Sequence, residues 1–404
     1  MIKVFEAFAG IGTQRMALRN LGIDHEVVAI AEIDKYAIAS YEAIHGDVNN
    51  LGDISKIKTE DIPDHDLFTY SFPCQDISVA GKQAGFKEGS GTRSGLLWEC
   101  EKVIEIKRPK YLLMENVKNL VGKKFKPDFD KWLERLEELG YSNYWQVLNA
   151  KDYGIPQNRE RVFCVSILGE HKPYAFPEPI PLEIRLKDLL EDEVDEKFYL
   201  SEEKTQQLVT SVPEKHSEKT VVKMNRHEVK GENELANTLL ARDYKGFGNQ
   251  DMNGVIEPVI AASRGRNPDN PSDRTPGSPT EQRLEVNQKG TSNTITTVQK
   301  DNYVVEPLGT LAAHNSDKFG TGYMDGVSKT LKANKHDISV MYNNYSIRKL
   351  TPKECWRLMG CSDEDFEKAQ QVNSNSQLYK QAGNAIVVDV LYHLFKELFI
   401  KAGK

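Results

Sequence analysis

Hydrophobic residues follow two different periods along the first 170 residues of the chain. In Phe129–Leu139 they recur at the spacing of an amphipathic helix, and Gly140 ends this pattern. Strands that alternate with helices predict a parallel sheet with helices on both faces and ligand sites at the carboxyl ends of its strands. Short apolar runs indicate such strands at Lys3–Phe8, Glu26–Ala31, Leu67–Phe72, Tyr111–Glu115, Tyr144–Leu148 and Arg161–Ile167.

The pattern changes beyond a stretch with four prolines at residues 173–181. Residues 230–345 are rich in Gly, Asn, Ser and Thr and contain only short apolar runs, which predicts loosely repeated β-hairpins. Within them, Arg264–Thr280 contains four prolines and no long apolar run, so we expect a long loop there.

Helical patterns return near the end of the chain. A helix is expected to begin at Pro352, and Ile386–Phe399 has the apolar stripe of an amphipathic helix. We therefore predict an α/β fold. A Rossmann-like sheet domain would combine residues 1–182 and 378–404, and a smaller, mainly β domain at 183–377 would be inserted between these two parts.

The composition is that of a soluble protein with a sizeable core, because 39% of the 404 residues are hydrophobic and 28% are charged. No run approaches the roughly 18 apolar residues of a membrane span, and the stretch after Met1 does not resemble a signal peptide. We therefore expect a cytoplasmic protein. The five cysteines include no C-x-x-C pair, which argues against a disulfide framework and against a metal site.

The net charge of −7 argues mildly against a nucleic-acid partner. Binding depends on local patches, however, and Lys118, Lys123, Lys124 and Lys126 form one such cluster. Taken alone, a lysine run is more often a solvated surface than a binding site.

A glycine-rich turn follows the first expected strand. The residues from Phe8 to Gly12 would let a ligand approach the backbone and the start of the next helix. Glu32 closes the second strand 22 residues after Gly10, a spacing that suits a carboxylate on a ribose hydroxyl. Because position 15 is Arg and the third glycine of G-x-G-x-x-G is missing, a simple packing turn is an equally good interpretation.

Three other strand ends carry reactive or charged side chains. Cys74 follows the third strand, Glu115 ends the fourth, and Arg159 and Arg161 lie at the start of the last one. A cysteine nucleophile needs neighbours that help it to ionise. By position alone, an inert cysteine, a helix-capping acid and a solvated strand start are equally good interpretations of these residues.

Together and in this order, these segments resemble the cytosine-5 DNA methyltransferase family, in particular its bacterial and phage members. The resemblance covers most of residues 1–170 and 347–404. It rests on nine motifs: Phe8-Ala-Gly-Ile-Gly, Glu32, Gly52-Asp-Ile, Phe72-Pro-Cys-Gln, Gly81-Lys-Gln-Ala-Gly-Phe, Glu115-Asn-Val, Gln157-Asn-Arg-Glu-Arg, Arg348-Lys-Leu-Thr-Pro-Lys-Glu and Gln381-Ala-Gly-Asn.

This resemblance implies methylation of carbon 5 of a flipped-out cytosine in a specific double-stranded DNA sequence, with S-adenosylmethionine as the methyl donor. Cys74 would attack ring carbon 6, and Glu115 would bind the base and protonate its ring nitrogen. Arg161, with Arg159 nearby, would contact the base carbonyl. The residues expected to bind the cofactor are Phe8, Ala9, Gly10, Ile11, Gly12, Glu32, Ile33, Asp53, Ile54, Pro73, Leu96, Asn384 and Ala385.

We expect DNA contacts from the segment after Cys74, from the lysine cluster and from the inserted domain, which would select the target sequence. The glycine-rich segment Asp76–Arg93 would close behind the flipped base. We expect a monomer, and a cognate restriction endonuclease would be a functional partner rather than a physical one. The expected DNA-binding residues are Gln75, Ser78, Lys82, Gln83, Lys118, Lys123, Lys124, Arg264 and Arg266.

Departures from the family pattern and three alternative functions bear on this prediction. Thr13 stands where a glycine is frequent, and Ala385 where a serine is frequent. Ile33 stands where many members carry an aromatic residue. An RNA cytosine methyltransferase could use the same scaffold, but the Cys-Phe-Thr segment of the tRNA-methylating branch is missing. The missing third glycine argues against a dinucleotide-dependent oxidoreductase. The presence of Cys74, Glu115 and Arg161 argues against a catalytically silent DNA-binding relative.

Overall fold

The computed structural model describes residues 1–74, 76–77, 85, 93–199, 229–230, 254–255, 259–267, 281–287, 303–307 and 345–401. Backbone contacts divide the chain into two compact units, one mainly of residues 1–184 and 352–404 and the other mainly of residues 185–293 and 299–351. Among the described residues, no helix combines the length and the apolar character that crossing a membrane requires.

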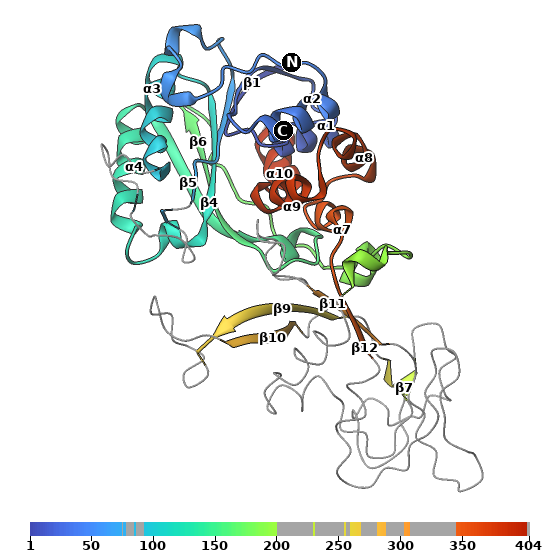
Figure 1. The fold of residues 1–404 in the computed structure, drawn as a ribbon. Coiled ribbons are helices and arrows are strands. Elements are labelled where there is room, and N and C mark those ends of the chain that lie inside the picture. The colour runs from blue at the N-terminus through green and yellow to red at the C-terminus, as the bar shows by residue number, and fades with distance from the viewer. Residues whose placement is uncertain are drawn as a thin grey trace, which may run out of the picture. The chain divides into compact units, whose positions relative to one another are not determined.

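The first unit is built on a six-stranded sheet with helices on both faces, as the sequence predicts. Figure 1 shows α3 and α4 on one face and α1, α2 and α10 on the other. The strands lie in the order β2-β1-β3-β4-β6-β5. Their bounds are β1 Ile2–Ala7, β2 His25–Ala31, β3 Leu67–Tyr70, β4 Tyr111–Val117, β5 Tyr141–Asn149 and β6 Glu160–Leu168.

One part of the expected topology is wrong, because the sheet is not parallel throughout. Strands β2, β1, β3 and β4 are parallel, whereas β6 runs antiparallel to both β4 and β5. The physical reason lies in residues 150–159, which join β5 to β6 and contain only the short 3-10 helix Ala150–Tyr153. A parallel crossover needs a dozen or more residues, usually with a helix.

The three helical patterns that the sequence predicts correspond to α4, α7 and α10. The apolar stripe of the last helix is buried, as expected, at Val387, Leu391, Leu394, Phe395 and Leu398. A π-helical turn, Lys396–Lys401, follows it. The helices are α1 Thr13–Asn20, α2 Lys35–His45, α3 Leu97–Lys107, α4 Lys126–Glu138, α7 Pro352–Arg357, α8 Asp363–Val372, α9 Asn375–Asn384 and α10 Val388–Phe395.

The boundary between the two units differs from the sequence-based one. The contacts place it at Pro352, whereas the sequence pattern suggested residue 378. Helices α7 and α8 account for the difference, because α8 packs against α2 and α7 packs against α9.

The described part of the second unit is mainly β. Four strands form an antiparallel sheet in the order β10-β9-β11-β12, and the short strands β7 and β8 form a separate parallel pair. Their bounds are β7 Val229–Lys230, β8 Gly254–Val255, β9 Val259–Arg266, β10 Glu281–Asn287, β11 Tyr303–Pro307 and β12 Tyr345–Lys349.

The expected loop Arg264–Thr280 begins later than predicted. Strand β9 continues through Arg266, and Arg264 pairs with Arg283 of β10. Polar residues do not prevent this pairing, because backbone groups make the hydrogen bonds of the ladder. The remainder of the expected loop, residues 268–280, lies outside the described residues.

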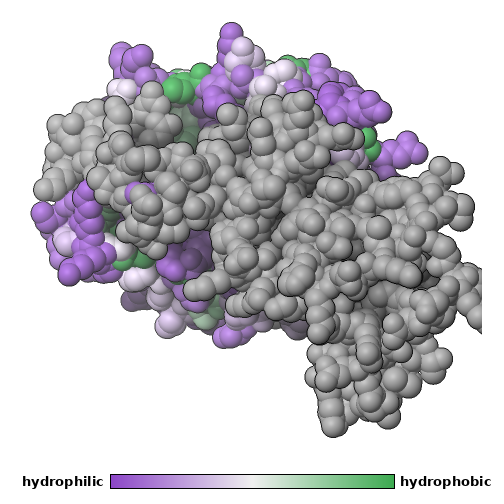
Figure 2. Space-filling view, turned by 60° about the horizontal axis from the view of Figure 1, so that its bottom comes forward, coloured by the Kyte–Doolittle hydropathy of each residue, from purple (hydrophilic) through white to green (hydrophobic). Residues whose placement is uncertain are grey.

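Hydrophilic residues dominate the described surface on the face shown in Figure 2, and the apolar residues there form small, separate patches. Large exposed hydrophobic side chains are likewise scattered along the described sequence, among them Ile33, Ile106 and Trp145. Isolated exposed apolar residues are normal on a protein surface. Ile33 differs from the others in that it also lines a pocket.

Candidate active site

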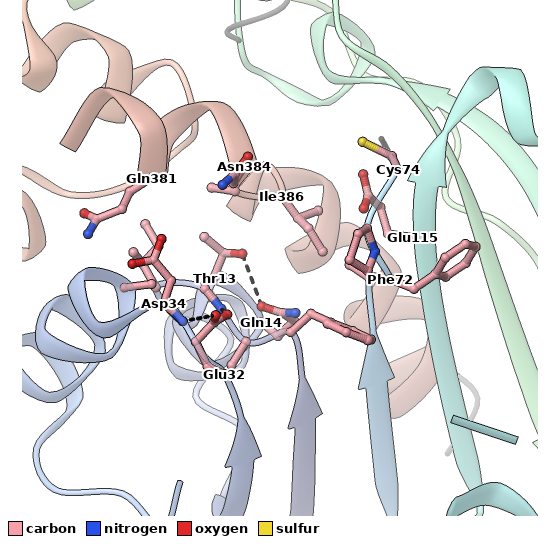
Figure 3. Close-up of a pocket in the computed structure, with 18 of the residues that line it drawn as sticks. Thr13, Gln14, Glu32, Asp34, Phe72, Cys74, Glu115, Gln381, Asn384 and Ile386 are labelled. Carbon is pink, nitrogen blue, oxygen red and sulfur yellow. Dashed lines mark hydrogen bonds between the residues drawn. The ribbon is translucent and has the colours of Figure 1, made fainter. Parts of the chain in front are cut away.

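A pocket of about 310 Å³ lies at the carboxyl ends of β1 to β4, where the sequence pattern predicts a ligand site. Figure 3 shows Cys74 and Glu115 together on one side of it, whereas Gln381 and Asn384 lie opposite Glu32 and Asp34. All four expected catalytic residues line this pocket. So do all of the expected cofactor-binding residues except Gly12.

The glycine turn after β1 has a backbone that few residue types adopt. Gly10 has φ +58° and Gly12 has φ +75°, in the left-handed region that glycine tolerates best. A Cβ on Gly12 would lie 2.6 Å from His45 Nε2 and 2.6 Å from Tyr41 Cε2, which is too close for any side chain. At Gly10 nothing lies within 4 Å of such a position. Gly12 therefore serves the packing of the turn, and Gly10 leaves its pocket side open.

Glu32, at the end of β2, holds the shape of this turn. One carboxylate oxygen accepts a hydrogen bond from the Gly10 N–H at 2.9 Å. The other accepts from the N–H groups of Ile33 and Asp34, both at 2.8 Å. The sequence suggested only a ribose acceptor here, but the carboxylate also fixes the backbone on which a ligand would lie.

Next to Glu32, the pocket offers an apolar contact and a second carboxylate. The Ile33 side chain is 73% exposed and lines the pocket. Asp53 begins the short helix Ile54–Lys56 and accepts hydrogen bonds from the Ser55 N–H at 3.1 Å and from its hydroxyl at 2.7 Å. These hydrogen bonds lower the pKa of Asp53, so its carboxylate is ionised at neutral pH.

Glu115 and Arg161 form an ion pair in the pocket, with 3.2 Å between Oε1 and Nε. They come from adjacent strands, since β4 carries Glu115 and β6 carries Arg161. Burial raises the pKa of Glu115, and the charges of Arg161 and Arg159 oppose this shift. Glu115 therefore holds a proton more readily than an exposed carboxylate does.

Cys74 is partly exposed, whereas the other four cysteines are buried. Burial raises the pKa of its thiol, and the negative charge of Glu115 raises it further. The charges of Arg161 and Arg159 lower it. In the resting protein the thiol is therefore protonated at neutral pH, and its ionisation depends on the charge of Glu115.

Arg159 links the pocket to the carboxyl-terminal segment. Its guanidinium is 4% exposed and donates from Nη2 to the carbonyls of Gly383, at 3.2 Å, and Ala385, at 2.8 Å. Burial and the nearby Arg161 lower the pKa of Arg159 to about 9, so it keeps its positive charge at neutral pH. It holds Gly383 and Ala385 in the wall of the pocket.

The structure adds pocket residues to which the sequence pattern assigns no catalytic or cofactor-binding role. Most of them belong to the recognised motifs or adjoin them. Asn116, next to Glu115, is an example, since its Nδ2 donates to the Phe72 carbonyl at 2.9 Å. Lys380 and Asp34 form an ion pair at 2.6 Å. The added residues are Thr13, Gln14, Ala31, Asp34, Ala37, Gly52, Ser71, Phe72, Asn116, Val117, Lys380, Gln381, Gly383 and Ile386.

The expected DNA-binding residues can be placed only in part. Lys118 is paired with Glu160 at 2.9 Å, and Lys123 and Lys124 are exposed. All three follow β4, the strand that carries Glu115. Arg264 and Arg266 belong to β9. The remaining expected residues lie outside the described part of the chain: Gln75, Ser78, Lys82 and Gln83.

The pocket combines a glycine turn, a cysteine and a carboxylate at the carboxyl edge of a sheet, and comparison with known proteins identifies the family. The model of the C-5 cytosine-specific DNA methylases matches residues 2–400. The chain therefore belongs to this family of cytosine-5 DNA methyltransferases.

Individual relatives agree with this assignment. The chain is 36% identical to the Type II methyltransferase M2.ScrFI of Lactococcus lactis subsp. cremoris, over 99% of each chain. It is 33% identical to the orphan methyltransferase M.SPRI of Bacillus phage SPR, over 98% of this chain and 97% of the relative. Among solved structures, an Entamoeba histolytica methyltransferase, EhMeth, has the same fold, with a TM-score of 0.62, 15% identity and coverage of 99% and 98% of the two chains.

Proposed function

We propose that the protein transfers a methyl group from S-adenosylmethionine to carbon 5 of a cytosine that is flipped out of duplex DNA, through a covalent adduct with Cys74. The observation that carries this proposal is the convergence of Cys74, Glu115 and Arg161 in the pocket that also contains the glycine turn. Family membership supports the reaction class and the DNA substrate.

The residues of the pocket fit S-adenosylmethionine. Gly10 leaves open space where a side chain would otherwise stand, and Ile33 offers an exposed apolar surface for the adenine. Glu32 would accept from the ribose hydroxyls and Asp53 from the adenine amino group. Asn384 and Ala385, in the wall held by Arg159, would border the other side of the cofactor. When bound, the cofactor would supply an electrophilic methyl group.

The side chains would then act on the base in a fixed order. Cys74 loses its proton and attacks carbon 6 of the cytosine, which forms the carbon–sulfur bond. Glu115 donates a proton to the ring nitrogen, and Arg161 binds the base carbonyl, so that negative charge does not build up on the ring. Carbon 5 takes the methyl group, and loss of its proton expels the Cys74 thiolate.

The pKa values of the site favour this order. A thiol beside a charged carboxylate ionises reluctantly, and the same thiol ionises more easily once that carboxylate is neutral. Glu115 is neutral when it carries a proton, and burial raises its pKa, so it takes up a proton more readily than an exposed carboxylate does. Arrival of a base that accepts a hydrogen bond from Glu115 would therefore coincide with activation of Cys74.

We further propose that the mainly β unit selects the target sequence. In the proposed mechanism the pocket residues would contact only one base and the cofactor, so they could not discriminate between flanking sequences. A polar insert of this length is difficult to justify on structural grounds alone. Arginine is the residue type that most often pairs with guanine in the major groove, and Arg264 and Arg266 lie in this unit.

A duplex with 5-fluorocytosine at the target position tests the covalent mechanism, because fluorine cannot leave as the proton does. We expect the parent protein to form a stable adduct with this duplex in the presence of S-adenosylmethionine, and Cys74→Ser to form none while it still binds the cofactor. Labelled methyl transfer should go to duplex DNA and not to tRNA. Methylation without any trapped adduct would contradict the role of Cys74, and transfer to tRNA would contradict the DNA substrate.

A further inference from the structure

In the turn that carries Cys74, three successive backbone carbonyls each accept a hydrogen bond. The Phe72 carbonyl accepts from Asn116 Nδ2 at 2.9 Å, and the Pro73 carbonyl accepts from Ser94 Oγ at 2.6 Å. The carbonyl of Cys74 itself accepts from the Ile77 N–H at 3.0 Å. The backbone on both sides of the thiol is therefore fixed by groups that lie outside the Pro-Cys dipeptide.

Ser94 contacts this turn at more than one place. Its hydroxyl donates to Pro73, the residue before Cys74, and lies 3.3 Å from the N–H of Asp76, the second residue after it. In return, the Asp76 carboxylate lies 3.3 Å from the N–H of Ser94. A serine hydroxyl can donate one hydrogen bond and accept another. The Ser94 hydroxyl does both, since it donates to the Pro73 carbonyl and accepts from the Asp76 N–H.

The position of Ser94 is set by the core of the first unit. Ser94 is 0% exposed. It belongs to the short 3-10 helix Arg93–Leu96, which leads directly into α3. Leu97, the first residue of α3, is also fully buried and packs in the hydrophobic core. Water therefore does not compete for the Ser94 hydroxyl, and the hydroxyl cannot move without disturbing the start of α3.

We infer that Ser94 is a positioning residue for the Cys74 thiol. This inference rests on the proposed role of Cys74 as the nucleophile. Attack on a ring carbon requires the sulfur to lie at a defined distance and angle, and a displacement of about 1 Å can cost about 100-fold in rate. By holding Pro73 and Asp76, Ser94 fixes the backbone from which the thiol projects.

A positioning role differs measurably from a purely structural one. Alkylation of a thiol by iodoacetamide needs no defined approach direction, whereas adduct formation with a bound cytosine does. Loss of a positioning bond should therefore slow adduct formation much more than it slows alkylation. Loss of a merely structural bond should instead lower the melting temperature and the cofactor affinity, and it should expose the thiol.

The experiment compares Ser94→Ala with Ser166→Ala as a matched control. Ser166 is also 0% exposed and also donates one hydrogen bond, to Asn143 Oδ1 at 2.7 Å, but it lies in β6 and outside the pocket. Each variant and the parent are mixed with a duplex containing 5-fluorocytosine and with S-adenosylmethionine, and the adduct is followed over time. Alkylation of the Cys74 peptide is followed by mass spectrometry, and cofactor affinity by calorimetry.

For Ser94→Ala we expect adduct formation to slow by about 10- to 100-fold, with alkylation of Cys74 and cofactor affinity within about threefold of the parent. Ser166→Ala should match the parent in all three measurements. Asp76→Ala removes only one of the bonds around Ser94 and affects a less buried residue. It should reduce the rate of adduct formation less than Ser94→Ala does, and it serves as the second variant if Ser94→Ala does not fold.

Two results would overturn the inference. Adduct formation by both Ser94→Ala and Asp76→Ala at the parent rate would show that these bonds do not align the thiol. Equal losses of adduct formation and alkylation in the folded variants would show that they act on thiol ionisation or access instead. Failure of the parent protein itself to form an adduct with the duplex would show that the proposed nucleophile is wrong, and the inference would fail with it. This outcome is distinct from the other two because it appears without any substitution.

Discussion

Glu115 Oε1 and Arg161 Nε lie 3.2 Å apart and line the same pocket as the Cys74 thiol, on which their two charges have opposite effects. The negative charge of Glu115 raises the pKa of the thiol, and the positive charge of Arg161 lowers it. Changing either charge should therefore change thiol reactivity in a known direction, independently of any effect on methyl transfer.

Glu115→Gln should make Cys74 more reactive but the enzyme less active. The neutral amide removes a charge that raises the pKa of the thiol, so more thiolate is present at a given pH below that pKa. Iodoacetamide should then alkylate Cys74 faster at pH 8. Methyl transfer in a single turnover should slow by about 10²- to 10⁴-fold, because the amide cannot deliver a proton to the base. Glu170→Gln, at an exposed position, should leave both rates unchanged. Slower alkylation of the Glu115 variant would contradict the assigned charge effect.

Arg161→Met should have the reverse effect on the thiol. Removal of its positive charge raises the pKa of Cys74 and also that of Glu115. Alkylation at pH 8 should therefore be slower than in the parent, and the pH at which alkylation reaches half of its maximal rate should move upward. Arg161→Lys keeps the charge and should remain closer to the parent. If both variants alkylate at the same rate, the charge of Arg161 does not act on Cys74.

Glu32→Ala should weaken S-adenosylmethionine binding by about 10-fold or more. Hydrogen bonds to a charged group contribute about 1.5–3 kcal/mol each, and the variant loses both the proposed ribose acceptor and the bond that holds Gly10. Glu32→Gln keeps one oxygen acceptor and should lose less. Calorimetry with the cofactor measures both variants, and DNA binding by the same proteins is the internal control. Unchanged cofactor affinity in Glu32→Ala would refute the assignment.

Glu6, on β1 beneath the glycine turn, should make stability depend on pH. Its carboxyl is fully buried and accepts from the Tyr41 hydroxyl at 2.9 Å. Burial raises its pKa from 4.5 to about 7. The folded state therefore holds this proton more tightly than the unfolded state, and the associated stability is complete below pH 4.5 and is lost as the pH rises through 7.

Between pH 5 and pH 8, Glu6→Gln should gain about 2–3 kcal/mol relative to the parent, because the amide never has to ionise. Urea unfolding of both proteins at the two pH values gives this difference directly. The comparison also removes the contribution of His45, whose pKa burial lowers to about 4 and whose effect has the opposite sign. A constant difference between variant and parent at both pH values would contradict the buried, protonated state of Glu6.

Substitutions in the two groups of expected DNA contacts should have different consequences. Arg264→Ala should relax the choice of base at one position of the target by about 1–3 kcal/mol if this arginine reads a base edge. Lys123→Ala should weaken binding to all sequences alike and flatten the salt dependence, because a phosphate contact carries no sequence information. Methylation maps and salt titrations of the two variants make the comparison. A map of Arg264→Ala identical to that of the parent would exclude the arginine from target choice.

The sequence predicts the central strands of the first unit well, because a buried strand needs an apolar run, as in β1, β3, β4 and β6. It fails for the direction of β6, since direction depends on the connection and not on the residues of the strand. Likewise, Arg264 was assigned to a loop from its proline-rich neighbourhood, but pairing with β10 keeps it in a strand.

The motifs predict which segments meet at the pocket, but not the bonds that hold them there. The bond from Asn116 to Phe72 joins residues 44 positions apart, and the bond from Ser94 to Pro73 joins residues 21 apart. Nothing in the local sequence encodes such pairs, because side chain to backbone bonds form only when the strands are in register. Lys380 also lines the pocket from α9, but it lies just outside the Gln381-Ala-Gly-Asn motif, so the sequence pattern did not include it.

The hydrogen bonds from Arg159 to Gly383 and Ala385 also constrain how the protein is made. Arg159 and Ala385 are 226 residues apart, so a ribosome needs roughly 10 to 45 s to pass from one to the other at about 5–20 residues per second. Throughout that interval Arg159 has been made, but the Gly383 and Ala385 carbonyls that accept its hydrogen bonds have not. The strands can assemble early, but the wall of the pocket that contains Gly383 and Ala385 can form only after α9 has been made. The pocket is therefore complete only when α9 has docked onto Arg159.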